Sequence, residues 1–268
     1  MNLAALNAEP RTAIVAQTWA MSKRAILALA RQPATVIPSL VFPLFFVALG
    51  TAAFSRATQL PNFPKVDSFL DFALAGAIVQ GVLFGSINSA AALATDIETG
   101  FFDRLLAAPS SRASILVSRL AGAMAYAGVQ TCLFVVVLLP FGLSMRAGPV
   151  GVLVMIAGGM LTALAVGGVM SAMAIRTGSS EAVQGAFPLL FILLFLSSAF
   201  FPRETMHGAY KRVADVNPIS HLVEGLRDLT IEGLSWSAVG RTLLISAGLA
   251  VAAMTIALRS LRKRIASR

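Results

Sequence analysis

Long stretches without a charged residue alternate along this chain with short polar segments. Six stretches contain no Asp, Glu, Lys or Arg: Gln32–Ser55, Phe72–Thr95, Leu120–Met145, Ala147–Ile175, Ala182–Pro202 and Thr242–Leu258. A helix of about 20 apolar residues, rising about 1.5 Å each, crosses the hydrocarbon layer of a bilayer. The last stretch is the shortest, and Arg241 and Arg259 at its ends can extend toward the headgroups. The pattern therefore predicts an all-α integral membrane protein with six transmembrane helices.

Two segments outside these stretches show helical patterns of their own. In residues 12–32 the apolar side chains follow one stripe, the basic residues lie largely off it, and Pro33 ends the pattern. This predicts an amphipathic helix in the membrane interface ahead of the first span, with a solvated basic tail as the alternative. Residues 203–234 hold two patterns too short to span, so we expect short outward helices that dip into or lie on the outer leaflet. The whole chain, 1–268, is predicted to be one transmembrane domain.

Composition and charge support a membrane location. The chain is 57% hydrophobic and 12% charged, whereas a soluble domain carries about 25% charged residues. Its net charge of +9 comes from basic residues spread over several segments, and no nucleic-acid-binding motif is evident, so no nucleic-acid partner is expected. If six spans alternate, 13 of the 21 Lys and Arg residues fall on the side of the termini. The positive-inside rule then places both termini in the cytoplasm.

Residues that support enzyme chemistry are sparse. His207 and His221 lie between spans five and six, and Cys132 lies within a span, so no metal site is expected. A phosphate-binding loop needs a lysine directly after a glycine, and none of the four lysines follows one. We therefore expect no enzyme activity and no cofactor on this chain. If ATP drives the protein, a separate subunit binds ATP and Mg²⁺.

Two other functional classes remain open. An ion-coupled secondary carrier usually has an ionisable residue inside the membrane; none of the six stretches contains one, although Asp96 and Glu181 lie at span ends. A membrane scaffold without transport activity is the other alternative. A channel is less favoured because neither a carbonyl filter nor a dense polar helix face is evident. The pattern favours a permease that moves a hydrophobic or amphipathic molecule with energy supplied by a partner.

The segment between spans two and three is too polar to span and too apolar for a solvated loop. Within residues 97–108, Phe101, Phe102 and Leu105 share one side of a short helix. Asp103 and Arg104 lie opposite. An apolar face on a cytoplasmic helix is typical of a segment that docks into a partner's groove. An interfacial loop that only anchors its neighbouring helices is the alternative.

The same segment carries a family resemblance. The residues that carry it are Asp96, Glu98, Gly100, Asp103, Leu105, Pro109, Arg112, Ile115-Leu116-Val117 and Arg119. They resemble the corresponding stretch of type-2 ABC exporter permeases, in particular the daunorubicin-resistance and nodulation-export branch. Two further stretches agree in order and spacing: Ser198-Ala199-Phe200-Phe201-Pro202, and Asn217-Pro218-Ile219-Ser220-His221-Leu222 followed by Glu224, Arg227 and Gly233.

The resemblance implies two permease copies that face each other, as a homodimer or a related heterodimer, and a separate ABC ATPase subunit. It implies a bacterial inner membrane location. It also implies that residues 97–108 form a coupling helix seated on the ATPase. Phe101, Phe102 and Leu105 would then fill the ATPase groove, and Glu98, Asp103 and Arg104 would make polar contacts around it.

The resemblance implies export of drugs, antibiotics, lipids or lipid-linked glycans. The apolar spans favour a hydrophobic or amphipathic cargo, because a glycan would require a polar, aromatic-lined channel. Phe42 and Phe45 in the first span, with Phe187 and Phe191 in the fifth, are candidates for the translocation path. Ordinary packing in the core or against lipid is an equal alternative for these four residues.

Overall fold

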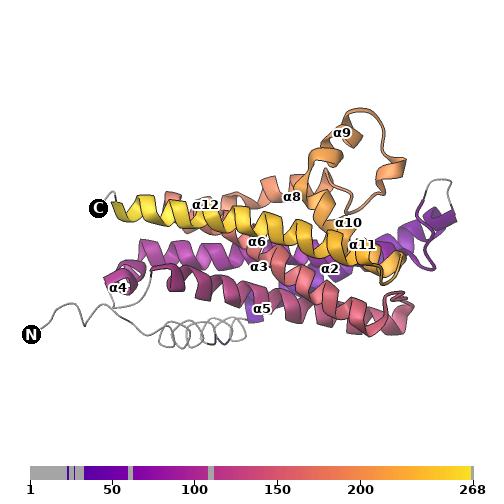
Figure 1. Cartoon of the computed structure of the whole chain (residues 1–268), viewed down its shortest axis with the longest axis horizontal. Coiled ribbons are helices and arrows are strands. Elements are labelled where there is room, and N and C mark those ends of the chain that lie inside the picture. Colours follow the sequence, from indigo (N-terminus) through magenta and orange to yellow (C-terminus); the bar gives the residue numbers. More distant parts are fainter. Residues whose placement is uncertain (1–22, 24–26, 28–32, 60–62, 108–111, 267–268) are drawn as a thin grey trace, which may run out of the picture.

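The protein is a bundle of helices that run along one long axis (Figure 1). The computed structural model describes Lys23, Leu27 and residues 33–59, 63–107 and 112–266, and these contain no strand. The long helices are α2 (Pro33–Phe54), α3 (Phe69–Glu98), α5 (Arg112–Leu138), α6 (Gly148–Thr177) and α12 (Ser246–Ala266). The short elements are η2 (Ser55–Gln59), α4 (Phe101–Ala107), η3 (Leu139–Phe141), α7 (Ser180–Gly185), α8 (Phe187–Phe195), η4 (Arg203–Thr205), α9 (Gly208–Val216), α10 (Pro218–Ile231), α11 (Trp236–Gly240) and η5 (Arg241–Ile245). The predicted interfacial helix, 12–32, lies outside the described residues apart from Lys23 and Leu27.

Five helical segments within the described ranges are long and apolar enough to cross a bilayer. They are Val36–Phe54, Phe69–Glu98, Ile115–Phe141, Gly148–Thr177 and Trp236–Ala266. They correspond to five of the six charge-free stretches, so the predicted all-α membrane fold is confirmed. The fifth stretch forms the shorter apolar segment Ser180–Phe195, and the count of six spans therefore stays a prediction.

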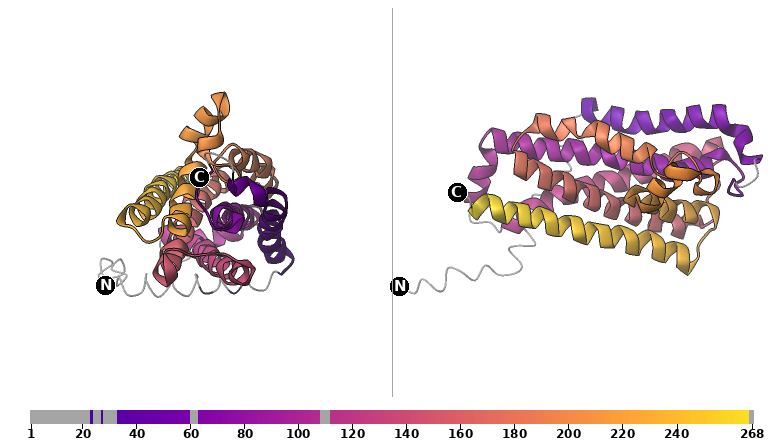
Figure 2. Two further views of the ribbon diagram at one scale, coloured as in Figure 1. Left: turned by 90° about the vertical axis from the view of Figure 1, so that its right-hand side faces the viewer. Right: turned by 90° about the horizontal axis from the view of Figure 1, so that it is seen from above.

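Helix α3 lies at the centre of the bundle (Figure 2). In its most apolar window 89% of the residues are buried, and it packs against α2, α5, α6, α7 and α10. Ser68 precedes its first turn as the N-cap, and the Ser68 side chain accepts a hydrogen bond from the backbone N–H of Leu70. Asp71 accepts hydrogen bonds from the backbone N–H of Ser144 at 2.7 Å and from its hydroxyl at 3.0 Å. These contacts hold the start of α3 against the loop between α5 and α6.

The fifth apolar stretch is broken into α7 and α8 and then ends early. Helix α7 ends at Gly185, and Pro188 lies in the first turn of α8. Proline has no N–H to donate to the preceding turn, so the helix is interrupted here. Helix α8 stops at Phe195, and residues 196–201 form turns. Gly76 of α3 allows this turn to approach closely, since a Cβ there would lie 2.7 Å from the Ala199 carbonyl oxygen. The predicted continuous span Ala182–Pro202 is thus interrupted at both of these points.

Of the two short helices predicted between spans five and six, one packs into the bundle and the other stands away from it. Leu222, Leu226 and Leu229 of α10 are buried, and α10 packs against α3 and α6. Helix α9 stands away from the bundle (Figure 1), and Val216 on it is exposed. Helix α10 is therefore part of the helical core, and the predicted position of these helices in or on the outer leaflet stays a prediction.

Candidate functional site

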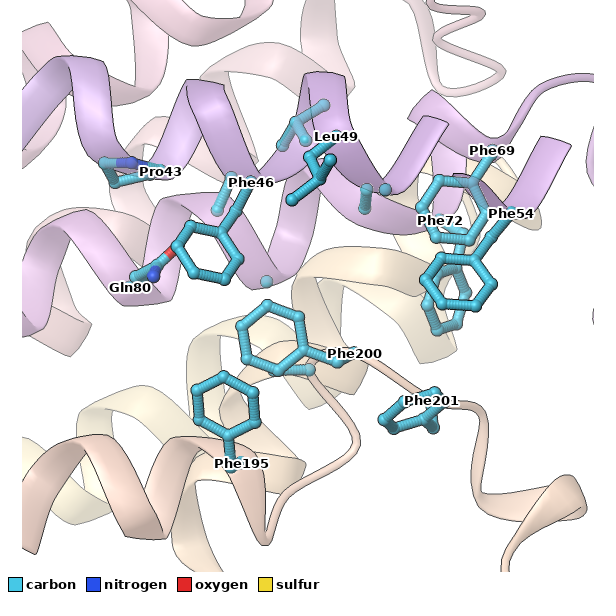
Figure 3. Close-up of a pocket in the computed structure, with 16 residues that line it drawn as sticks. Pro43, Phe46, Leu49, Phe54, Phe69, Phe72, Gln80, Phe195, Phe200 and Phe201 are labelled. Carbon is cyan, nitrogen blue, oxygen red and sulfur yellow. The ribbon is translucent and has the colours of Figure 1, made fainter. Parts of the chain in front are cut away.

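An aromatic cavity lies between α2, α3 and the turn that follows α8. Its volume is about 190 Å³. Figure 3 shows Phe46 of α2 facing Phe195 and Phe200, with Phe54, Phe69 and Phe72 grouped farther along the cavity. The described lining residues are Pro43, Phe46, Val47, Leu49, Gly50, Phe54, Phe69, Phe72, Ala73, Gly76, Ala77, Gln80, Phe195, Ala199, Phe200 and Phe201. Seven of the sixteen are phenylalanines, so the cavity offers ring faces and edges rather than hydrogen bonds.

Phenylalanine rings continue from this cavity toward the end of the bundle where α4 lies, which we call the α4 end. The Phe195 and Phe200 rings are stacked with centroids 4.6 Å apart, and Phe195 contacts Phe191 at 5.0 Å. Phe187 stacks on Phe191 at 5.5 Å and contacts Phe84 at 5.1 Å. These separations are typical of interacting aromatic pairs. The rings form one contiguous series, which we call the aromatic track.

The four path residues predicted from sequence have different positions. Phe42 lies 6.3 Å from Phe191, ring centroid to centroid, so the structure brings the first and fifth spans together as the path prediction requires. Phe187 and Phe191 line a second, smaller cavity of about 10 Å³ beside the track. Phe45 is 56% exposed on the outer surface of α2. None of the four lines the larger cavity, and their role as a path remains a prediction.

Gln80 of α3 lies where the two cavities adjoin. It lines both the larger and the smaller cavity, and all their other described lining side chains are apolar. The side chain is 1% exposed. Its amide nitrogen, Nε2, has no hydrogen-bond partner among the described residues. The sequence shows Gln80 only as one of several polar residues within spans, and helix periodicity did not indicate which one faces a cavity.

Arg227 of α10 contacts Phe72 and Ala199, two lining residues of the aromatic cavity, toward the end of the bundle opposite α4. We call this end the α11 end. Its guanidinium donates to the Phe72 carbonyl oxygen at 3.2 Å and to the carbonyl oxygens of Ser198 and Ala199 at 2.8 and 3.1 Å. The Ser198 and Ala199 carbonyls lie in the turn that follows α8, and a buried carbonyl in such a turn needs a donor. Burial lowers the pKa of Arg227 to about 10, and the charge of Glu224 opposes this shift. The side chain is therefore cationic at neutral pH.

A polar cavity of about 220 Å³ lies on the other side of Arg227. Charged residues dominate its lining: Arg203, Glu204, Glu224, Arg227, Asp228, Glu232 and Arg241. Arg203 pairs with Glu224 at 2.6 Å, and Arg241 pairs with Asp228 at 3.2 Å. Burial raises the pKa of Asp228, and Glu232 adds to this effect. Arg227 thus separates an apolar cavity from a charged one.

The predicted coupling segment forms the short helix α4, after a break at Gly100. Gly100 has a φ of +70°, which glycine adopts without strain. Phe102 is 2% exposed and packs in this chain's own core with Ile97 and Ile115. This differs from the prediction that its ring enters a partner groove. Phe101 and Leu105 are half-buried and retain surface for such a contact.

The polar residues around α4 connect it to the fifth apolar segment. Glu98 accepts hydrogen bonds from the backbone N–H of Ser180 at 2.6 Å and from its hydroxyl at 3.0 Å. Ser180 is the first residue of α7, and a carboxylate at a helix N-terminus is favourable. Arg104 is exposed and Asp103 is half-buried. The structure therefore joins the segment before α4 directly to the segment that carries Phe187 and Phe191.

These features define the class of protein: a multi-span α-helical membrane protein with an aromatic cavity among its helices and a short helix outside them. The chain belongs to the ABC-2 type transporter family: the sequence model of this family matches residues 16–231. This confirms the resemblance found in the segment from Asp96 to Arg119 and its two companion stretches.

Individual relatives agree with this assignment. The chain is 29% identical to the daunorubicin resistance ABC transporter permease protein DrrB1 of Streptomyces coeruleorubidus, over 95% of this chain and 89% of the relative. It is 30% identical to the putative transport permease ycf38 of Pyropia yezoensis, over 88% and 80%. It is 25% identical to the probable doxorubicin resistance ABC transporter permease protein DrrC of Mycobacterium tuberculosis, over 88% and 85%. The similarity extends over nearly the whole chain in each comparison.

Proposed function

We propose that this chain is the permease subunit of an ATP-driven exporter that moves a hydrophobic or amphipathic molecule, such as a drug, an antibiotic or a lipid. The observation that supports this most is the aromatic cavity between α2 and α3 and its continuation through the aromatic track. Apolar cavities with few polar groups are typical of sites for small hydrophobic ligands. The drug-resistance names of two relatives agree with such a cargo.

The energy source in this proposal is a separate ABC ATPase subunit that binds ATP and Mg²⁺. The sequence contains no Gly-Lys pair for a phosphate-binding loop, which supports an ATPase on another chain. Helix α4 is the docking element, with Phe101 and Leu105 as its apolar contacts and Arg104 as an exposed polar contact. Movement of α4 then reaches α7 through the hydrogen bonds between Glu98 and Ser180.

A second permease copy, identical or related, completes the transport path. One cavity of about 190 Å³ is smaller than the roughly 300–1,000 Å³ of sites for drug-sized ligands. Two facing cavities together reach this range. The exposed apolar side chains of α2, among them Phe45 and Leu49, provide a surface for the second copy or for lipid.

The α4 end faces the cytoplasm in this proposal, and the membrane is a bacterial inner membrane. The basic residues of the last turn of α12, Lys263 and Arg264, lie at the α4 end (Figure 1). An excess of Lys and Arg is typical of the cytoplasmic side. Both termini are then cytoplasmic.

Export of a lipid-linked glycan by the same architecture is the second candidate cargo, and an ion-coupled carrier is the second candidate mechanism. The lining of the aromatic cavity favours the hydrophobic cargo, because Gln80 is the only polar side chain among its described lining residues. A glycan carries many hydroxyl groups, and each would lose its hydrogen bonds to water in such a cavity.

Transport by the reconstituted complex tests the proposal. The permease and its ATPase are placed in liposomes with the ATPase outward, and uptake of fluorescent daunorubicin is followed after ATP is added. We expect uptake that requires ATP and persists when ion gradients are collapsed. Phe200→Ala should lower the uptake rate about tenfold, because the Phe200 ring packs against both Phe46 and Phe195.

Phe141→Ala is the matched control, since Phe141 is 73% exposed beyond the end of α5 and does not line the cavity. Its uptake rate should equal that of the unmodified chain. Uptake driven by an ion gradient without ATP would instead support the secondary carrier. ATP-driven flipping of a fluorescent lipid-linked glycan, with no daunorubicin uptake, would support the glycan exporter.

A further inference from the structure

Gln80 has an unusual environment for a buried amide. Its side chain is 1% exposed, and Nε2 is without a hydrogen-bond partner among the described residues. A buried donor is normally paired, because an unpaired one loses its hydrogen bonds to water without any replacement. A second buried glutamine in the bundle, Gln130, uses its Nε2 to donate to the Ile78 carbonyl oxygen at 3.1 Å. The Nε2 group of Gln80 is therefore available to donate a hydrogen bond to a molecule that enters the cavity it lines.

The position of Gln80 indicates where that partner would come from. Gln80 is shared by the larger aromatic cavity and the smaller cavity beside Phe84 and Phe187. In Figure 3 it lies beside Phe46 at the end of the cavity away from Phe69. The last torsion of a glutamine side chain has broad preferences, so the amide can turn its N–H groups toward either cavity. A molecule on the aromatic track passes this one amide.

We propose that Gln80 is the specificity-determining residue of the transport site, and that it donates a hydrogen bond to an acceptor oxygen on an aromatic cargo. This deepens the proposed export function and rests on it. The ligand class is a fused-ring aromatic molecule that carries a ring carbonyl or a similar acceptor. The rings pack against Phe46, Phe195 and Phe200, while the oxygen satisfies the Gln80 amide.

Specificity arises here from the asymmetry of hydrogen bonding in an apolar site. An acceptor oxygen that enters the cavity loses its bond to water, and Gln80 is the one described lining side chain that can replace it. A fully apolar ring system enters without this loss but leaves Nε2 unsatisfied. The amide therefore favours the molecule with the acceptor over its hydrocarbon counterpart by about 5- to 10-fold, the contribution of one hydrogen bond.

Binding of two matched probes tests this inference. Fluorene and 9-fluorenone share one three-ring skeleton, and only fluorenone carries a carbonyl oxygen. The full-length permease in nanodiscs is dialysed to equilibrium against each radiolabelled probe, and binding to empty nanodiscs is subtracted. We expect fluorenone to bind about 5- to 10-fold more tightly than fluorene. Gln80→Met, which keeps the size and removes the amide, should bring this ratio to about one while fluorene binding remains.

Ser86→Ala is the matched control in the same helix. Ser86 is also buried, and its Oγ is also without a partner among the described residues, but it lines neither cavity. The ratio should stay at its original value in this variant. Retained fluorene binding by Gln80→Met shows that the variant is folded.

The possible outcomes separate this inference from the proposed function. If both probes bind and the ratio is the same with Gln80 and with Met, the role of Gln80 is overturned while the aromatic site stands. If Ser86→Ala removes the preference equally, the effect is a general one of helix packing, and the role of Gln80 is again overturned. If neither probe binds above empty nanodiscs, the aromatic transport site itself fails, and this inference fails with it.

Discussion

The guanidinium carbon of Arg227 lies 3.7 Å from the centre of the Phe72 ring, so one charged side chain of α10 stacks on a residue that lines the aromatic cavity. Stacking of a cation on an aromatic face is most favourable where water is excluded, and Arg227 is 6% exposed. The same guanidinium bonds three carbonyl oxygens, of Phe72, Ser198 and Ala199. Arg227 thus connects α10, the first turns of α3 and the turn after α8.

Arg227→Lys should destabilise the folded protein by about 2 kcal/mol or more. Lysine keeps the charge but cannot bond three carbonyls with one planar group or stack flat on Phe72. Thermal unfolding of the purified protein in detergent measures the change. Arg241→Lys is the control, because the Arg241 side chain is 63% exposed in its pair with Asp228, and exposed pairs contribute about 0–1 kcal/mol. Equal effects of the two substitutions would show that Arg227 has no special structural role.

Asp228 should make stability depend on pH. Burial raises its pKa above the usual 3.8, so the folded protein holds this proton more tightly than the unfolded chain does. Its contribution to stability is then fully present below pH 3.8 and is lost as the pH rises through the folded pKa. Asparagine does not titrate, so Asp228→Asn removes this loss of stability at higher pH. The unfolding temperature of the variant, relative to the unmodified chain, should rise as the pH is taken from 4 to 7; a constant difference would contradict the shift.

Glu98→Ala should uncouple ATP hydrolysis from transport. The substitution removes the hydrogen bonds that join the segment before α4 to Ser180 at the start of α7. ATP hydrolysis by the complex should continue, while cargo moved per ATP should fall about tenfold. The ratio is measured in proteoliposomes with daunorubicin. Glu181→Ala is the control, since Glu181 is exposed one residue farther along α7. An equal fall in cargo moved per ATP in this variant would mean that loss of any negative charge near α7 causes the effect, and not loss of the hydrogen bonds to Ser180.

The helices themselves were largely predictable from sequence. The charge-free stretch Ala147–Ile175 appears as α6, Gly148–Thr177, because a membrane helix satisfies its backbone within itself and needs only a long apolar run. The fifth stretch was predicted as one span, and Pro188 is the local signal that indicates its break. Residues 203–234 were correctly predicted to form short helices. That α10 packs inside the bundle depends on contacts with α3, which is distant in sequence.

The candidate site was predictable only in part. Phenylalanines in the first and fifth apolar stretches were predicted to line a path; the Phe42 and Phe191 rings do lie near each other, and their role in a path stays a prediction. The larger cavity involves Phe72 and Phe200, which lie more than a hundred positions apart, and no local pattern indicates that they meet. Phe102 shares its helical face with Phe101, yet it is buried in this chain's own core, because the break at Gly100 turns α4 back onto the bundle.

Phe101→Asp should abolish association with the ATPase while membrane insertion stays intact. The half-buried Phe101 lies in the first turn of α4, and a carboxylate in an apolar groove would lose its hydration without a partner. Co-purification of the ATPase with the tagged permease measures the effect. Leu234→Asp, a similar change at an exposed apolar residue of the α11 end, should leave co-purification unchanged. Normal ATPase recovery with Phe101→Asp would exclude this residue from the docking contact.

Gln80→Met should stabilise the cargo-free protein, by about 1 kcal/mol. An unpartnered buried amide costs about 1–3 kcal/mol relative to a satisfied one, and methionine fits the same space while packing against apolar neighbours. Thermal unfolding in detergent without cargo measures the gain. Gln130→Met should have the opposite sign, because it removes the hydrogen bond to the Ile78 carbonyl oxygen. A loss of stability with Gln80→Met would mean that the amide has a partner within the folded protein, and its availability for cargo would be contradicted.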